Sequence, residues 1–252
     1  MWKYVVTSVR GSAHLVNGLP CQDSGLGRQI GEVIVIALAD GAGSAKFSDE
    51  GSRVVVETTL EFFANFFAGH PQPGLLLEEL DITDGRLLLK LIRQKLENFA
   101  NDRSSALHEY ASTMLVGIIH HSGSCFYQIG DGVWCVSKSN VLAAATWPQQ
   151  GEYAGQTDFV TSKIAEASLQ FAFIKGSIDF AVGMTDGLER LALDFRCCVP
   201  HRGFCEPLIN GLLEAKDQSA LKHQLDLFLE SSRILERTDD DKTLALIAHD
   251  GL

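Results

Sequence analysis

Residues 33–44, VIVIALADGAGS, carry the clearest structural signal of the chain. The run from Val33 to Ala39 is short, apolar and rich in β-branched residues, which is typical of a strand buried on both faces. Asp40 is its first charged residue, and a carboxylate at the edge of a buried strand needs a partner. Gly41 and Gly43 allow a sharp turn, so the backbone can approach a metal ion, a phosphate or a neighbouring amide held by Asp40.

Length and composition indicate an ordinary globular protein. The 252 residues are 46% hydrophobic and 21% charged, and without a linker or an internal repeat they predict a single domain over 1–252. The formal charge of −11 argues against binding to nucleic acid or to an anionic membrane. Because the sequence has no signal-peptide pattern and no apolar run of about 18 residues, it predicts a cytoplasmic protein.

Helices and strands are expected in separate groups along the chain. Helical periodicity begins near Ser48 and again near Thr83 or Asp84. Short apolar runs separated by turn residues fill 112–145, as expected of antiparallel strands. Since the two kinds of element do not alternate strictly, the pattern predicts an α+β fold in which helices cover a sheet or a sandwich. Loops are predicted from composition at 11–25 and 151–159.

Carboxylates recur where apolar runs end or begin. Asp40, Asp131 and Asp186 each follow such a run and precede a glycine, and residues 239–241 come directly before the last run. One Asp-Gly pair is typical of a simple turn. Four such sites at one rim would repel one another and have raised pKa values unless a cation neutralised them. With only oxygen ligands in the repeated positions, the pattern favours Mg²⁺ or Mn²⁺ over zinc.

The cysteines offer a second metal hypothesis, which is weaker. None of the six cysteines lies in a CxxC pair, and the segment CCVPHRGFC does not have the spacing of common zinc sites. We therefore predict reduced thiols. The zinc ligands of this alternative would be Cys197, Cys198, His201 and Cys205.

Six motifs in succession give the chain a resemblance to a known family. They are CQD at 21–23, ADGAGS at 39–44, STMLVG at 112–117, IGDG at 129–132, TDGL at 185–188 and TDDDKTLALI at 238–247. In this order they resemble the metal-dependent type 2C protein phosphatases, and most of all the small bacterial PphC-like branch with CQD and DGAGS motifs. The resemblance implies a four-layer αββα sandwich of two antiparallel sheets flanked by helices.

The resemblance also implies a two-metal centre, in which Mn²⁺ or Mg²⁺ activates a bridging water for attack on a phosphomonoester. Asp40 is expected to bridge the two ions, and Asp23 to hold metal-bound water. Asp131 is expected to join Asp186 around a third, more weakly held ion. Besides Asp40, the implied ligands are the Gly41 carbonyl and Gln22 for one main ion, and Asp186 and Asp240 for the other.

Three positions depart from the common pattern of the family. Ala42 replaces a histidine proposed as general acid, Gln22 replaces a glutamate ligand, and Gly18 replaces a phosphate-binding arginine. We expect His14 to protonate the leaving oxygen instead, with a purely structural histidine as the alternative. Other candidates for phosphate binding are Arg10 and Lys46.

The predicted function is hydrolysis of phosphoserine and phosphothreonine in proteins that a partner serine/threonine kinase has phosphorylated. One alternative is a catalytically weak pseudophosphatase that binds phosphoproteins or regulates them. Another is a nucleotide-binding protein in which GAGSAK forms a phosphate loop after a strand. This last hypothesis is disfavoured because Lys46 occupies the place of the third glycine and a meander does not suit a parallel sheet.

Overall fold

The computed structural model describes residues 1–149 and 157–251, so most of the loop predicted at 151–159 lies outside the described residues. Two five-stranded sheets have the strand orders β1-β12-β9-β6-β7 and β2-β3-β4-β5-β8, and all their neighbouring strands are antiparallel. A separate two-stranded ladder joins β10 and β11. The strands are β1 (Trp2–Val9), β2 (Ser24–Ile30), β3 (Val33–Ala39), β4 (Met114–His120), β5 (Gly123–Ile129), β6 (Val133–Lys138), β7 (Val141–Thr146), β8 (Gln170–Lys175), β9 (Phe180–Met184), β10 (Leu193–Asp194), β11 (Val199–Pro200) and β12 (Lys242–His249).

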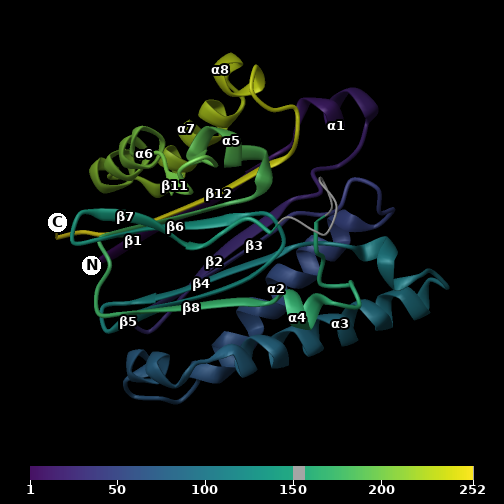
Figure 1. Ribbon diagram of the computed structural model, residues 1–252, viewed down its shortest axis with the longest axis horizontal. Helices are drawn as coiled ribbons and strands as arrows, with labels where there is room; N and C mark the ends of the chain where they lie inside the picture. The colour runs from purple at the N-terminus through teal and green to yellow at the C-terminus, as the bar shows by residue number, and fades with distance from the viewer. Residues whose placement is uncertain (150–156, 252) are drawn as a thin grey trace.

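The long helices cover the outer faces of the two sheets (Figure 1). Helices α2 and α3 pack on the β2-β3-β4-β5-β8 sheet, and α6 and α7 pack on the other. The predicted four-layer αββα sandwich is thereby confirmed. The helices are α1 (Ser12–Asn17), α2 (Ser48–Phe67), η1 (Pro73–Glu79), α3 (Ile82–Asp102), η2 (Leu107–Tyr110), α4 (Ala165–Ser168), η3 (Asp186–Leu188), α5 (Glu189–Ala192), α6 (Arg202–Glu214), α7 (Gln218–Leu229) and α8 (Ser232–Leu235).

Strand β3 contributes to two layers of the apolar core. All seven of its residues are buried, as the sequence predicts. Successive side chains of a strand point to opposite faces, so alternate residues of β3 pack against the helices and against the second sheet. Val33, Val35, Ala37 and Ala39 belong to the core beneath α2 and α3, whereas Ile34, Ile36 and Leu38 belong to the core between the sheets.

Residues 11–25 are not simply a loop. They contain the six-residue helix α1, which ends at Gly18 in the left-handed conformation, with φ +67°. Strand β2 then begins at Ser24, although the glycines of SGLGRQI obscure its alternating pattern. A side chain at Gly27 would lie 2.7 Å from the ring of Tyr4 in the other sheet. Close packing between the sheets therefore explains a glycine where a strand usually has a larger residue.

The topology brings the recurring carboxylates to one end of the sandwich. Strands β3 and β5 are both antiparallel to β4, so they run in the same direction. Asp40 and Asp131, which follow them, therefore lie at the same end of the sheet. In the other sheet β9 pairs antiparallel with β12, so Asp186 after β9 lies beside the start of β12, which Asp240 precedes. Carboxylates far apart in the sequence thus meet at a single rim.

Within the described part of the chain, no helix combines the length and the apolar character needed to cross a lipid bilayer.

Candidate metal centre

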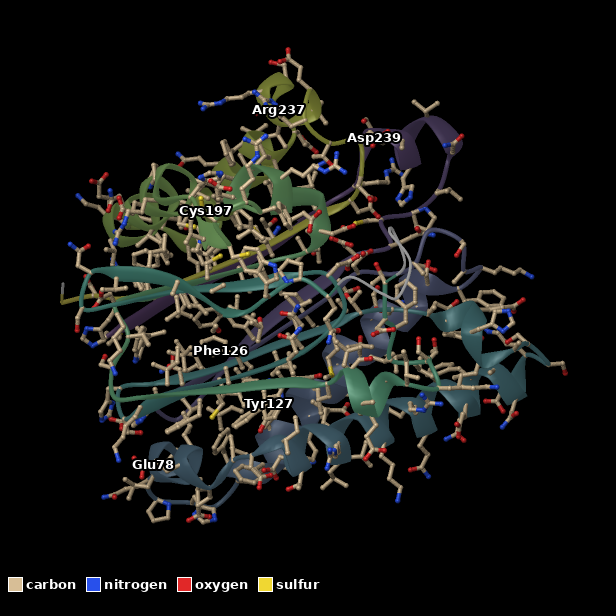
Figure 2. The ribbon with its side chains drawn as sticks, viewed as in Figure 1. Glu78, Phe126, Tyr127, Cys197, Arg237 and Asp239 are labelled. Atoms are coloured by element: carbon tan, nitrogen blue, oxygen red, sulfur yellow. The ribbon has the colours of Figure 1, made fainter. Side chains whose placement is uncertain are left out.

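A pocket of about 630 Å³ lies at this rim. Asp239 lines this pocket, and Figure 2 shows it beside α1. The backbone N–H of Ala13 in α1 donates a hydrogen bond to the Asp239 carbonyl. The pocket brings together every predicted site residue except Asp23, which lies behind Asp40. The predicted residues in its lining are His14, Gln22, Asp40, Gly41, Asp131, Asp186 and Asp240.

Three carboxylates form one wall of the pocket, which we call the carboxylate wall: Asp40, Asp131 and Asp186. Oxygen atoms of all three lie within 4.8 Å of one another. Burial, followed by repulsion from Asp131 and other nearby carboxylates, raises the pKa of Asp186 to about 8. Burial also raises the pKa of Asp131, and burial together with Asp23 and Asp186 raises that of Asp40. No lysine or arginine in the described lining of the pocket balances the repulsion between these side chains.

The backbone of Asp40 is fixed by the neighbouring strand. Its N–H donates to Thr113 Oγ1 at 2.8 Å, and the Thr113 N–H donates to the Asp40 carbonyl at 2.8 Å. Gly41 follows in a very narrow space, because a Cβ there would lie 2.5 Å from the Ser48 carbonyl oxygen. A larger residue at this turn would therefore displace the backbone beside Asp40.

Asp23 lies behind the carboxylate wall. It is buried, and its Oδ2 accepts a hydrogen bond from Thr185 Oγ1 at 2.8 Å. Its carboxyl group lies close enough to that of Asp40 to raise the pKa of Asp40. Burial, outweighing the hydrogen bond from Thr185, raises the pKa of Asp23 to about 7. Asp23 can thus hold a proton next to Asp40 at neutral pH.

Two buried oxygen atoms beside the pocket have no hydrogen-bond partner among the residues that the structure describes. They are Gln22 Oε1 and Asp131 Oδ1. Buried polar atoms are nearly always satisfied, so these two oxygens favour a ligand that accepts electron pairs. An oxygen-only donor set suits a hard divalent cation such as Mg²⁺ or Mn²⁺. The residues present therefore fit the metal centre that the sequence predicts.

The opposite side of the pocket, which we call the loop wall, is formed by the N-terminal loop around Gly11, His14 and Gln22. Asp241 holds this loop by accepting hydrogen bonds from the backbone N–H groups of Gly11 at 2.6 Å and Gln22 at 2.5 Å. Its other contact is with His14 Nδ1 at 2.8 Å. Since Asp241 engages Nδ1, the free nitrogen of His14 is Nε2.

The described lining of the pocket contains no lysine or arginine. Arg10 instead donates to the Leu19 carbonyl, and the ammonium group of Lys46 lies 4.9 Å from the centre of the Phe47 ring. Neither basic residue considered for phosphate binding is therefore part of the described pocket. Ala42, which replaces the histidine common in the family, does line the pocket. His14 therefore supplies the imidazole in the described lining.

Sequence reasoning missed two acidic residues of this region. Asp241 belongs to the noticed run TDDDK, but its role in holding the loop depends on tertiary contacts. Glu189 begins α5 just after Asp186, and burial, with repulsion from Asp131, raises its pKa to about 7. The sequence could have indicated Glu189 because it directly follows the TDGL motif at 185–188.

A larger pocket of about 740 Å³ lies along α3. Its charged lining is mainly basic, with Glu97 and Glu166 as the acidic members, and it lacks the carboxylate cluster. Metal chemistry is therefore assigned to the smaller pocket at the rim. The basic residues of the α3 pocket are Arg86, Lys90, Arg93 and Lys163.

Comparison with known proteins agrees with this acidic centre. The family model described as protein phosphatase 2C matches residues 10–230, which leaves Asp240 and Asp241 beyond the matched range. Serine/threonine-protein phosphatase 3 of Escherichia coli (strain K12) is 33% identical over 255 residues, covering 97% of each chain. The protein is thus a serine/threonine phosphatase with a candidate acidic metal centre. The chain belongs to the protein phosphatase 2C family.

Solved structures share the fold at much lower sequence identity. A bacterial serine phosphatase superposes with a TM-score of 0.66 at 16% identity, covering 98% of both chains. The serine/threonine phosphatase Stp1 from Staphylococcus aureus has the same TM-score and identity, covering 100% of this chain and 96% of its own. These relatives confirm the fold, and they give no support to the pseudophosphatase alternative or to a nucleotide-binding fold.

Proposed function

We propose that this protein hydrolyses phosphoserine and phosphothreonine in proteins, with two divalent cations bound at the rim pocket. The observation that carries the proposal is a pocket of about 630 Å³ whose described charged residues are almost all carboxylates. A phosphate dianion would be repelled by such a lining, so cations must accompany it. The same cations would relieve the repulsion that raises the carboxylate pKa values.

The proposed ligands are those that the family resemblance implies, and the clustering of Asp40, Asp131 and Asp186 supports them. Asp40 would contact both ions, with Asp186 and Asp240 on one side, and with Gln22 and the Gly41 carbonyl on the other. Asp131 would take part in a third, weaker site with Asp186. When bound, Mg²⁺ or Mn²⁺ lowers the pKa of water and neutralises charge on phosphoryl oxygens.

Two further residues are proposed to handle protons. Asp23 would hold metal-bound water at the pocket floor and could accept a proton from it. His14 is directed by Asp241, which leaves Nε2 to donate a proton to the leaving serine or threonine oxygen. With Ala42 in place of a histidine, this donor comes from the loop wall rather than from the turn after β3.

The wider setting of the enzyme is also part of the proposal. Its substrates would be the products of a serine/threonine kinase, and no nucleic acid or membrane is required. All six cysteines are free thiols, which supports a reducing compartment such as the cytoplasm. The continuous sandwich supports one catalytic domain over 1–252.

Turnover of a phosphothreonine peptide tests the proposal. We expect hydrolysis with Mn²⁺ or Mg²⁺, none after addition of EDTA, and a loss of at least about 10³-fold in Asp40→Ala, because that residue would contact both ions. Glu57→Gln changes an exposed carboxylate on α2 and should retain full activity. Undiminished turnover by a folded Asp40→Ala protein would reject the metal mechanism, and Mn²⁺ binding without turnover by the unmodified chain would support the pseudophosphatase.

A further inference from the structure

A second group of metal-ligating side chains lies at the opposite end of the β2-β3-β4-β5-β8 sheet. It consists of Glu32, His120 and His121, and one ligand atom from each lies within 4.8 Å of the other two. Glu32 belongs to the two-residue turn between β2 and β3, and His121 to the turn between β4 and β5. Because β3 pairs antiparallel with β4, the start of β3 lies beside the end of β4 and the two turns are neighbours.

His120 is held rigidly at the base of this group. Its side chain is only 5% exposed, and its Nδ1 contacts Ser122 Oγ at 2.8 Å and the Ser122 backbone nitrogen at 3.2 Å. The Ser122 hydroxyl in turn donates to the Gly74 carbonyl at 2.8 Å. Gly74 itself packs on the ring, because a Cβ there would lie 2.0 Å from His120 Cε1. The orientation of the imidazole is therefore determined by its neighbours.

The other ring nitrogen of His120, Nε2, faces Glu32. Nε2 is buried and has no hydrogen-bond partner within residues 1–149 and 157–251, and Glu32 Oε2 is 3.5 Å away. The ring centre of His121 lies 3.7 Å from that of His120. A buried nitrogen with an imidazole and a carboxylate beside it is the arrangement of an incomplete metal site.

We propose that Glu32, His120 and His121 bind a divalent late transition-metal ion of the zinc class. Two imidazoles and one carboxylate suit Zn²⁺ far better than Mg²⁺, and water can complete a tetrahedron. Tetrahedral bonds of about 2.1 Å place neighbouring ligand atoms about 3.4 Å apart, so the group must contract slightly. The exposed side chains of Glu32 and His121 can make this adjustment, since that of Glu32 is 77% exposed. Ser122 would be the outer partner that orients His120.

This site is separate from the proposed catalytic centre. Glu32 precedes β3 and Asp40 follows it, and seven residues at about 3.3 Å each place the two ends roughly 20 Å apart. Figure 1 shows the β4–β5 turn at the end of the sandwich that carries both chain termini. The bound ion would join two hairpin turns and stabilise the folded protein by mass action. The inference does not rest on phosphatase activity.

Zn²⁺ binding in excess Mg²⁺ tests the proposal, because Mg²⁺ occupies oxygen-only sites and competes poorly for imidazole. Equilibrium dialysis of the full chain should show Zn²⁺ that Mg²⁺ does not displace, and Zn²⁺ should raise the melting temperature. His121→Ala should weaken this binding by more than about tenfold, and Ser122→Ala by about tenfold. His223→Ala, which removes an exposed histidine on α7, should bind Zn²⁺ like the unmodified protein.

The outcomes separate this site from the catalytic one. Mn²⁺-dependent turnover should be unchanged in His121→Ala, since no residue of the rim pocket is altered. Equal Zn²⁺ affinity in His121→Ala and the unmodified chain would place the ion elsewhere and overturn the proposal. Failure of the unmodified protein to bind Zn²⁺ would also overturn it and leave Glu32 and His120 as an ordinary ion pair.

Discussion

The carboxylate wall and the loop wall of the rim pocket are both built around buried acidic residues, yet their electrostatics are opposite. Asp40, Asp131 and Asp186 face one another, and burial raises the pKa of each. Asp241 is even less exposed than these three, but it accepts two backbone N–H bonds and contacts His14. The carboxylate wall therefore lacks partners that added cations would supply, whereas Asp241 in the loop wall has its partners within the protein.

This difference shows that the number of acidic residues does not by itself define a metal site. Donors supplied by the fold turn Asp241 into a structural anchor, while Asp186 lacks them and remains available to a cation. Under the proposed function, the carboxylate wall would bind the metal ions, and Asp241 in the loop wall would position the imidazole of His14. Four predictions test that separation.

Of these four predictions, the largest effect is expected from His14→Ala. Removing the proposed proton donor should slow hydrolysis of phosphoserine peptides by about 10²-fold, because an alkoxide leaves poorly without protonation. Aryl phosphates with good leaving groups should be hydrolysed at nearly the original rate. The ratio of kcat/KM for the two substrates measures this. An equal loss on both would show that the loop wall acts through folding or metal binding instead.

Matched substitutions of Asp186 and Asp241 should change stability in opposite directions. In metal-free protein at pH 7, Asp186→Asn should raise the free energy of unfolding by about 2 kcal/mol, because a carboxyl group with a raised pKa is removed. Asp241→Asn should lower it by about 2 kcal/mol, because an amide cannot accept all the hydrogen bonds of the loop. Urea unfolding measures both values. Destabilisation by both variants would contradict the distinction between the walls.

The stability of the metal-free protein should fall as the pH rises. The folded pKa values of Asp23, about 7, and Asp186, about 8, lie above that of an unfolded aspartate, 3.8. Between these limits the folded state binds more protons than the unfolded state, so stability present at pH 4 is lost toward pH 8. We expect each of the two groups to contribute a slope of about 1 kcal/mol per pH unit, and saturating Mg²⁺ should flatten it. If the stability of the metal-free protein did not change with pH, the raised pKa values of these buried carboxyl groups would be contradicted.

The smallest effect is expected from Gln22→Glu, which places a charge where the two walls meet. An amide oxygen can bind a cation but brings no net charge, so the ion on the Gly41 side should be the weaker one. The added carboxylate should strengthen it by about 1 kcal/mol after desolvation, or roughly fivefold. Calorimetric titration with Mn²⁺ should resolve two classes of site, of which only the weaker changes. A single unaltered class would remove Gln22 from the ligand set.

The sequence alone predicted the layered fold and most of the carboxylate wall. Apolar runs that end in Asp-Gly mark strand ends directly, so Asp40, Asp131 and Asp186 could be recognised without knowledge of strand order. The loop wall could not be predicted in the same way. The contact between His14 and Asp241 joins residues 227 positions apart, and the local pattern of α1 shows no buried face. Strand β2 was missed because its glycines are explained only by packing between the sheets.

Anomalous diffraction from crystals grown with Mn²⁺ would test the central claim most directly, because it locates the ions without relying on activity. We predict two manganese peaks that share Asp40, one beside Asp186 and Asp240 and the other beside Gln22 and the Gly41 carbonyl. The Asp40→Asn protein should lose at least one of the peaks. Occupied manganese sites that avoid Asp40, or fully loaded crystals with no ion at the carboxylate wall, would contradict the account.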